Sequence, residues 1–201
     1  MKYEPYMRVA NGLWGLNRGL GMTELGLLDA LVNHLTELFN GYELPSKSGL
    51  LQQVRVFAQF LPQPSGVTFR TLEDSESTTP QGYSTEDLES NFPCVVVKID
   101  GVTDKEEGSQ DQSIISVRFL IGVYDADPAC QGYRDVFNII ETIRQDLLTI
   151  PARILDQRYR LVTPLTSYLF DEQPWPIFFG QMESMWGSGR PLMPNAYEIS
   201  F

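Results

Sequence analysis

The chain has 201 residues, of which 42% are hydrophobic and 20% charged, a composition typical of a globular domain and not of a disordered segment. Its formal net charge of −11 disfavours a protein that grips nucleic acid or adsorbs to anionic lipid, because such a surface repels phosphate groups. No apolar run approaches the roughly 20 residues that cross a bilayer, and residues 1–10 lack the apolar stretch of a signal peptide. We therefore expect a protein made in the cytoplasm, with no membrane partner.

The first predicted element is an amphipathic helix that follows a glycine-containing arm. Residues 1–22 carry four glycines and no sustained period, so we expect an N-terminal arm there. Thr23 is a suitable N-cap, and Asn40 followed by Gly41 is a stop signal. Apolar residues recur every three or four positions between these signals: Leu25, Leu28, Leu31, Val32, Leu35 and Leu38.

An alternating segment and an acidic insertion come next. Residues 51–61 alternate in polarity and predict a strand, which Pro62 and Pro64 end. Residues 72–91 are rich in Ser, Thr, Gly, Pro and acids, and such a composition cannot bury enough apolar surface to offset the entropy of ordering. We expect this insertion to lie outside the compact core. Its acids face no basic residue: Glu73, Asp74, Glu76, Glu86, Asp87 and Glu89.

Two strands and a polar loop are predicted in the middle of the chain. Residues 93–100 form a short β-branched segment, and residues 113–124 alternate without a break, which together favour an antiparallel hairpin. The connection, residues 101–112, is polar, and residues 103–112 are interpreted either as a solvated loop or as a loop that contacts a partner. The candidate interaction residues of this loop are Asp104, Lys105, Glu106, Glu107 and Asp111.

A second helix is predicted after the turn at residues 125–132, and Pro151 ends it. We expect its apolar face to pack on the sheet residues Ile115, Val117 and Phe119, because burial of such side chains stabilises by about 1.5–3 kcal/mol each. The predicted apolar face consists of Tyr133, Val136, Phe137, Ile140, Ile143 and Leu147.

Residues 159–170 and 177–186 predict two more strands, around a proline-rich turn that contains Trp175. In the second of these strands both faces are apolar, which predicts helices on one side and another subunit on the other. One face carries Phe178, Met182 and Trp186, and the other carries Ile177, Phe179 and Met185. The order of elements predicts an α+β fold: a small, mostly antiparallel sheet with two helices on one face. We expect one domain over residues 23–186 and a loose tail over residues 187–201.

Catalytic and metal-binding patterns are sparse in the sequence. His34 has no second metal ligand at a suitable spacing, which favours a structural histidine. Cys130 precedes a helix but has no histidine partner, and we interpret it and Cys94 as reduced thiols. The acids of the polar loop lack the spacing of an EF-hand, and no glycine-rich loop carries the residues that cradle phosphate. We predict no catalytic, cofactor or metal site and no enzymatic activity.

The segments IISVRFLIGVYDADPACQGYRDVFNIIETIRQDLL and RYRLVTPLTSYLFDEQPWPIFFGQMESMW resemble the tail terminator (tail completion) proteins of long-tailed bacteriophages. The likeness rests on Tyr124-Asp125 at a strand end, on residues 131–135 opening a helix, and on residues 172–182 in the last hairpin. It covers about half of the chain. The acidic insertion and the N-terminal arm depart from a minimal member of that family.

The resemblance implies a structural virion protein that forms a ring, usually of six copies, in the phage neck. Such a ring caps the tail tube, joins it to the head connector proteins and carries DNA only as passing cargo, after assembly in the host cytoplasm. The alternatives are a neighbouring neck or head-completion protein and, from another class, a small ligand-binding domain or hydrolase. A ring-former should associate with itself or on the tube protein, whereas an enzyme domain need not.

Overall fold

The computed structural model of the chain describes residues 23–62, 89–107 and 110–189. The predicted arm (residues 1–22), most of the predicted acidic insertion and residues 190–201 lie outside this part of the chain. The elements in chain order are α1 (Glu24–Leu38), β1 (Glu43–Pro45), β2 (Leu51–Gln53), β3 (Arg55–Ala58), β4 (Cys94–Glu107), β5 (Gln110–Tyr124), α3 (Gly132–Thr149), the 3₁₀ turn η1 (Pro151–Arg153), β6 (Ile154–Leu155), β7 (Tyr159–Leu169) and β8 (Ile177–Gly189).

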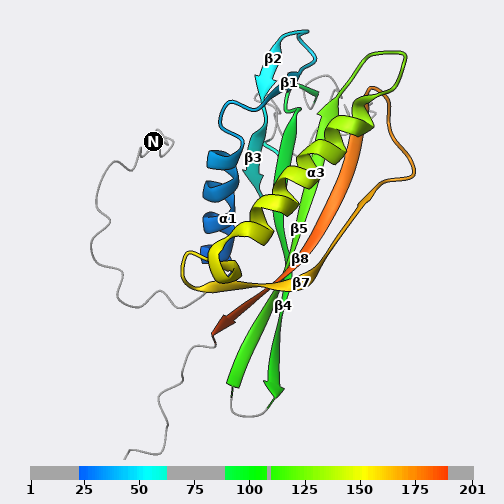
Figure 1. Cartoon of the computed structure of the whole chain (residues 1–201). Helices are drawn as coiled ribbons and strands as arrows, with labels where there is room; N and C mark the ends of the chain where they lie inside the picture. Colours follow the sequence, from blue (N-terminus) through cyan, green and yellow to red (C-terminus); the bar gives the residue numbers. More distant parts are fainter. Residues whose placement is uncertain (1–22, 63–88, 108–109, 190–201) are drawn as a thin grey trace, which may run out of the picture.

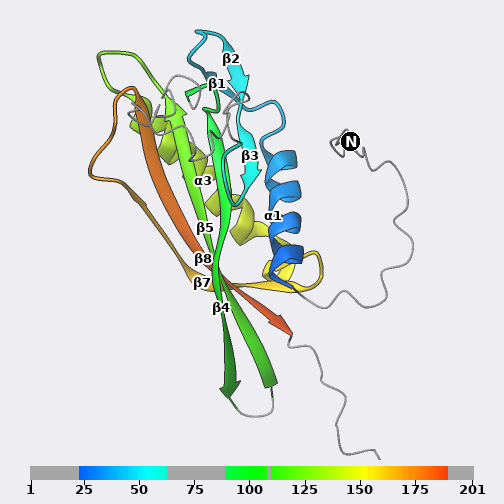
Figure 2. The ribbon, with the colours of Figure 1, turned by 180° about the vertical axis from the view of Figure 1, so that it is seen from behind.

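The described residues form a two-layer α+β fold, as predicted. Six strands make one twisted sheet in the order β3-β4-β5-β8-β7-β6, and every neighbouring pair is antiparallel except β3 and β4. Both helices cover the same face of this sheet, as the two opposite views show (Figures 1 and 2). Strands β1 and β2 form a separate two-stranded hairpin.

Helix α1 begins and ends where the sequence predicts. The Oγ1 of Thr23 accepts a hydrogen bond from the backbone N–H of Gly26 at 3.2 Å, which caps the helix. Gly41 follows the helix with a φ of 78°, a left-handed conformation that glycine adopts without strain. The predicted apolar face is wrong at Leu25, which is exposed because it lies roughly a quarter turn from the centre of the buried stripe. The buried residues are Leu27, Leu28, Leu31, Leu35 and Phe39.

Helix α3 packs on β5 and β8, and the prediction is wrong for one residue of its face. The side chain of Phe137 is 46% exposed, and Ile139 is buried in its place. At 100° per residue, Phe137 lies about a quarter turn from the centre of the buried stripe, whereas Ile139 lies closer to it. Glycine at position 180 of β8 permits the close approach of this helix, because a Cβ there would lie 2.5 Å from Cγ1 of Val136.

The strand predicted over residues 51–61 is divided between two sheets. Val54 donates its backbone N–H to the carbonyl oxygen of Tyr42 at 2.9 Å and so continues the small hairpin. The next residue, Arg55, donates to the carbonyl oxygen of Pro93 at 3.2 Å and starts the parallel pairing of β3 with β4. The chain therefore changes partners at Val54, and the prediction of one continuous strand is wrong.

The end of the predicted acidic insertion belongs to the folded part of the chain. A carboxylate oxygen of Glu89 lies 2.7 Å from Nζ of Lys47, so the expectation that Glu89 faces no basic residue is wrong. Asn91 is buried. The predicted loose tail also begins too early, because β8 continues through Gly187 to Gly189 and pairs there with β5.

Residues 103–107 and 110–112 do not form the predicted polar loop. Strands β4 and β5 continue through them, and their pairing runs from Cys94 opposite Gly122 to Glu107 opposite Gln110, with one irregularity between Ile99 and Gly101. The polar composition of this segment did not prevent strand formation, because strand propensity depends on the neighbours that a residue meets in the sheet. The far end of this hairpin extends beyond the helices (Figure 1).

Candidate interaction surface

The sheet face opposite the helices is here called the outer face. Successive side chains of a strand point to opposite faces, so every second residue of each strand lies on the outer face. On the inner face, Val95, Val97 and Phe119 belong to the core, which includes residues of both helices. Their neighbours Cys94, Val96 and Leu120 therefore point to the outer face. The outer face is apolar at the end where Cys94 of β4, Gly122 of β5 and Phe179 of β8 lie side by side.

At that end an apolar hollow holds about 490 Å³. The rings of Phe92 and Phe179 meet edge to face in this hollow, with 5.6 Å between their centroids. The ring of Phe92 lies against Gly122, where an added Cβ would be 2.3 Å from Cε1 of Phe92, so only glycine permits this contact. At the rim, Phe60 is 75% exposed. Residues that line the hollow are Gln59, Phe60, Leu61, Phe92, Cys94, Val96, Lys98, Leu120, Ile121, Gly122, Phe170 and Phe179.

The two cysteines occupy opposite environments, which leads to a testable prediction. Burial raises the pKa of the Cys94 thiol to about 12, whereas Cys130 is exposed in the turn before α3. Because the thiolate is the reactive form, we expect a water-soluble thiol reagent to label Cys130 and to leave Cys94 unlabelled in the native protein. Mass spectrometry should find one label in native buffer and two after denaturation. Equal labelling of both thiols in native buffer would contradict the burial of Cys94.

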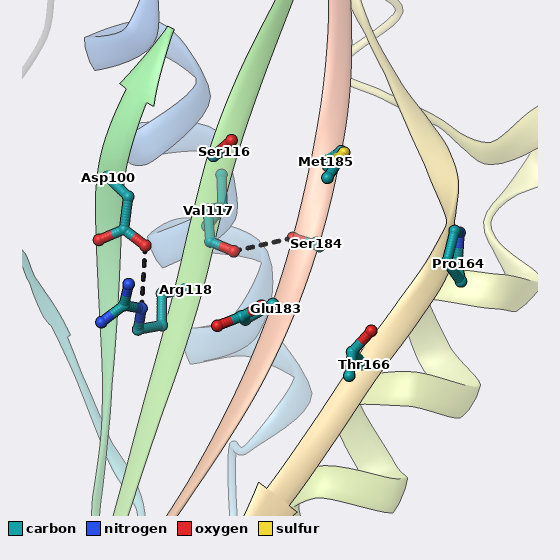
Figure 3. Close-up of a pocket in the computed structure, with 9 residues that line it drawn as sticks. All are labelled: Asp100, Ser116, Val117, Arg118, Pro164, Thr166, Glu183, Ser184 and Met185. Carbon is teal, nitrogen blue, oxygen red and sulfur yellow. Dashed lines mark hydrogen bonds and ion pairs between the residues drawn. The ribbon is translucent and has the colours of Figure 1, made fainter.

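The middle of the outer face is polar and carries a smaller hollow of about 190 Å³ (Figure 3). Arg118 of β5 and Asp100 of β4 form an ion pair there, with 2.9 Å between Nε and Oδ2. Among the residues that the structure describes, Arg118 Nε has no hydrogen-bond partner. Glu183 of β8 accepts a hydrogen bond from Nε2 of Gln181 at 2.7 Å. Charged groups of both signs beside an exposed Met185 suit a polar contact with another protein.

All five predicted interaction residues lie on the far part of the β4–β5 hairpin. Asp104 is opposite Ser113, Lys105 is opposite Gln112, and Glu106 is opposite Asp111 in the ladder. The Oδ1 of Asp104 accepts a hydrogen bond from the hydroxyl of Ser113 at 2.5 Å. The fold thus brings these residues together on two paired strands and not on a loop.

His34 joins the two helices. Its Nε2 lies 2.5 Å from Oδ2 of Asp146 in α3, and both side chains are partly buried. The position matches the structural role expected from the sequence. Asp146 was not predicted as its partner, because 112 positions separate the two residues and no local pattern connects them.

Sequence reasoning also missed a group of arginines. Arg153, Arg158 and Arg160 are exposed around the short hairpin of β6 and β7, at the sheet edge farthest from β3. The signal in the sequence was the clustering of three of the 15 basic residues within the eight positions 153–160. Three residues, 156–158, connect the paired residues Leu155 and Tyr159, and Asp156 and Gln157 adopt left-handed φ values of 49° and 55° in this turn.

Comparison with known proteins adds no assignment, since no family model matches the chain and no curated protein matches it. Within residues 23–62, 89–107 and 110–189, no three His, Cys, Asp or Glu side chains are grouped so that they could hold a metal ion. Neither helix in the described part of the chain has the length and apolar character needed to cross a membrane.

Proposed function

We propose that this protein is a tail terminator of a long-tailed bacteriophage, a structural virion protein without catalytic activity. It forms a ring, of six copies by analogy with the family it resembles, that caps the tail tube and meets the head connector proteins. DNA passes through the ring without being bound, and the acidic net charge suits such a conduit because a basic wall would retain phosphate groups.

The observation that carries this proposal is the long β4–β5 hairpin. Its strands have 14 and 15 residues, and its far end extends beyond the helices (Figure 2). The part of the strands that continues past the helices is not covered by them, and it is therefore available for contacts with neighbouring subunits. The apolar hollow of the outer face, with Phe60 exposed at its rim, supplies a second surface suited to assembly.

Electron microscopy of the purified protein, alone and mixed with the tail tube protein of the same phage, tests the proposal. We expect closed rings of uniform diameter, and caps at the ends of tubes in the mixture. A sizing measurement should show a mass several times that of one chain, which is 22.8 kDa. Monomers in both samples, together with tubes of unlimited length, would contradict the proposal.

The apolar hollow favours one competing function, a small ligand-binding domain. Its volume of about 490 Å³ falls in the range of small-molecule sites, roughly 300–1,000 Å³. A ligand-binding domain should remain monomeric and should be stabilised against heat by an apolar ligand. A ring-former should instead gain thermal stability with protein concentration, because association favours the folded state.

A further inference from the structure

One edge of the sheet is open and acidic. Strand β3 pairs only with residues 94–97 of β4, and the side chain of Gln59 accepts a hydrogen bond from the N–H of Ile99 at 3.2 Å. From Asp100 to Glu107, no other strand within the described residues pairs with β4 on that side. Residues 100–107, here called the acidic edge, contain four acids and one lysine. Asp100 forms an ion pair with Arg118, and Asp104 accepts a hydrogen bond from Ser113. An open edge of this kind offers backbone groups to another chain.

The opposite edge of the sheet is basic. Residues 153–160, here called the arginine hairpin, contain Arg153, Arg158 and Arg160 and a single acid, Asp156. Arg158 lies 3.8 Å from Asp156 at the surface, a contact that water and salt weaken. All three arginine side chains are exposed. Acids outnumber bases by 26 to 15 in the whole chain, whereas the arginine hairpin has three bases and one acid.

The strand register places the two edges at the same level of the sheet. Thr103 is opposite Ile114, Ile114 is opposite Gly187, and Gly187 is opposite Arg160. Three strand spacings of about 4.8 Å separate β4 from β7, so the two charged segments are about 14 Å apart or more across the sheet and cannot pair within one chain. In a second copy rotated about an axis beside the sheet, the arginine hairpin reaches the same level as the acidic edge.

We infer that the acidic edge of one copy binds the arginine hairpin of the next copy. The contact is heterologous: each copy uses two different surfaces, and repetition closes a ring when the rotation fits. This inference rests on the proposed ring and names the surfaces that join its subunits. A second copy is the favoured partner because both halves of the contact, with opposite charge and matching level, are present on the same chain.

Charge reversal tests the contact. One variant carries Glu106→Lys and Glu107→Lys, a second carries Arg153→Glu, Arg158→Glu and Arg160→Glu, and a third combines all five changes. The first variant changes the net charge from −11 to −7, because each replacement of Glu by Lys adds two charges. Weaker overall repulsion would by itself favour association. A loss of association in this variant therefore has to come from the local contact.

Sedimentation velocity measures the outcome for each protein at equal concentration. We expect wild type to sediment as an assembly, both partial variants to sediment as monomers, and the combined variant to regain the assembly because its edge and hairpin are again opposite in charge. An equimolar mixture of the two partial variants should also assemble, since each supplies the surface that matches the other. Added salt should shift every assembled sample toward monomer.

A matched control carries Glu37→Lys and Glu43→Lys, the same change of net charge on two exposed acids away from both edges. It should assemble as wild type does, and circular dichroism should confirm that every variant is folded. If the partial variants assemble normally, or if the combined variant does not recover, the contact is wrong while a ring built on other surfaces stands. If wild type itself stays monomeric, the contact between free copies is wrong, and the ring is wrong as well if it also fails to form on the tail tube protein.

Discussion

Replacing Trp186 with alanine is expected to lower the free energy of unfolding by about 3–5 kcal/mol. Trp186 has no exposed surface and is the largest fully buried side chain of the described residues. Its indole N–H donates a hydrogen bond to Oγ of Ser184 at 2.9 Å inside the core. Truncation removes the buried ring, leaves a cavity and leaves Ser184 with one partner fewer. Urea denaturation followed by circular dichroism measures the loss.

Trp175 provides the matched control for this prediction. It lies 11 positions earlier in the same aromatic segment, but its side chain is 58% exposed in the turn before β8. Trp175→Ala should therefore change the free energy of unfolding by less than about 0.5 kcal/mol. A similar loss in both variants would show that burial does not distinguish the two tryptophans. Each measurement should be repeated at two protein concentrations, because association adds to apparent stability.

Replacing Ile140 with alanine is expected to lower the free energy of unfolding by about 2–5 kcal/mol. Ile140 is buried on the face of α3 that packs on the sheet. Its Cδ1 lies 3.1 Å from the position that a Cβ would occupy at Gly180, so the helix and β8 are in close contact there. The surrounding side chains cannot fill the missing volume without moving the helix. The same denaturation measurement applies.

Phe137 is the control for the helix. The side chain of Phe137 is 46% exposed to solvent on the same helix. Phe137→Ala therefore removes little buried surface and should lower the free energy of unfolding clearly less than Ile140→Ala does. If Phe137→Ala proves the more destabilising of the two, the orientation of α3 on the sheet is wrong. An exposed phenylalanine beside the buried stripe also marks a surface that an assembly could cover, in which case the substitution affects association and leaves the isolated chain stable.

Local signals in the sequence predicted the helices well and their faces less well. Thr23 and Pro151 mark a cap and a stop that act on the nearest backbone groups, so the helix ends follow from the chain alone. The face is harder to predict. Phe137 and Leu25 are as apolar as their neighbours, and only the position of the sheet decides that they lie at the margin of the buried stripe.

The polar residues of the β4–β5 hairpin illustrate a different failure. Residues 103–112 have the composition of a loop, yet 103–107 and 110–112 pair as strands because they extend a ladder that is already in register. Strand propensity measures how well a side chain fits its neighbours, and these neighbours are not visible in the segment itself. The five candidate interaction residues were identified from charge, and their placement on a strand pair came from the structure.

The order of elements in the sequence predicted the α+β class. The sequence by itself also determined the start of α1, the end of α3 and the grouping of Phe178, Met182 and Trp186 on one face of β8, because each of these depends on residues within one element. Only the tertiary structure decided the parallel pairing of β3 with β4, the ion pair of Lys47 with Glu89 and the row that joins Thr103 to Arg160. These features connect segments that lie far apart in the chain. Their positions follow from how the sheet orders and aligns its strands, and local periodicity carries no information about that order.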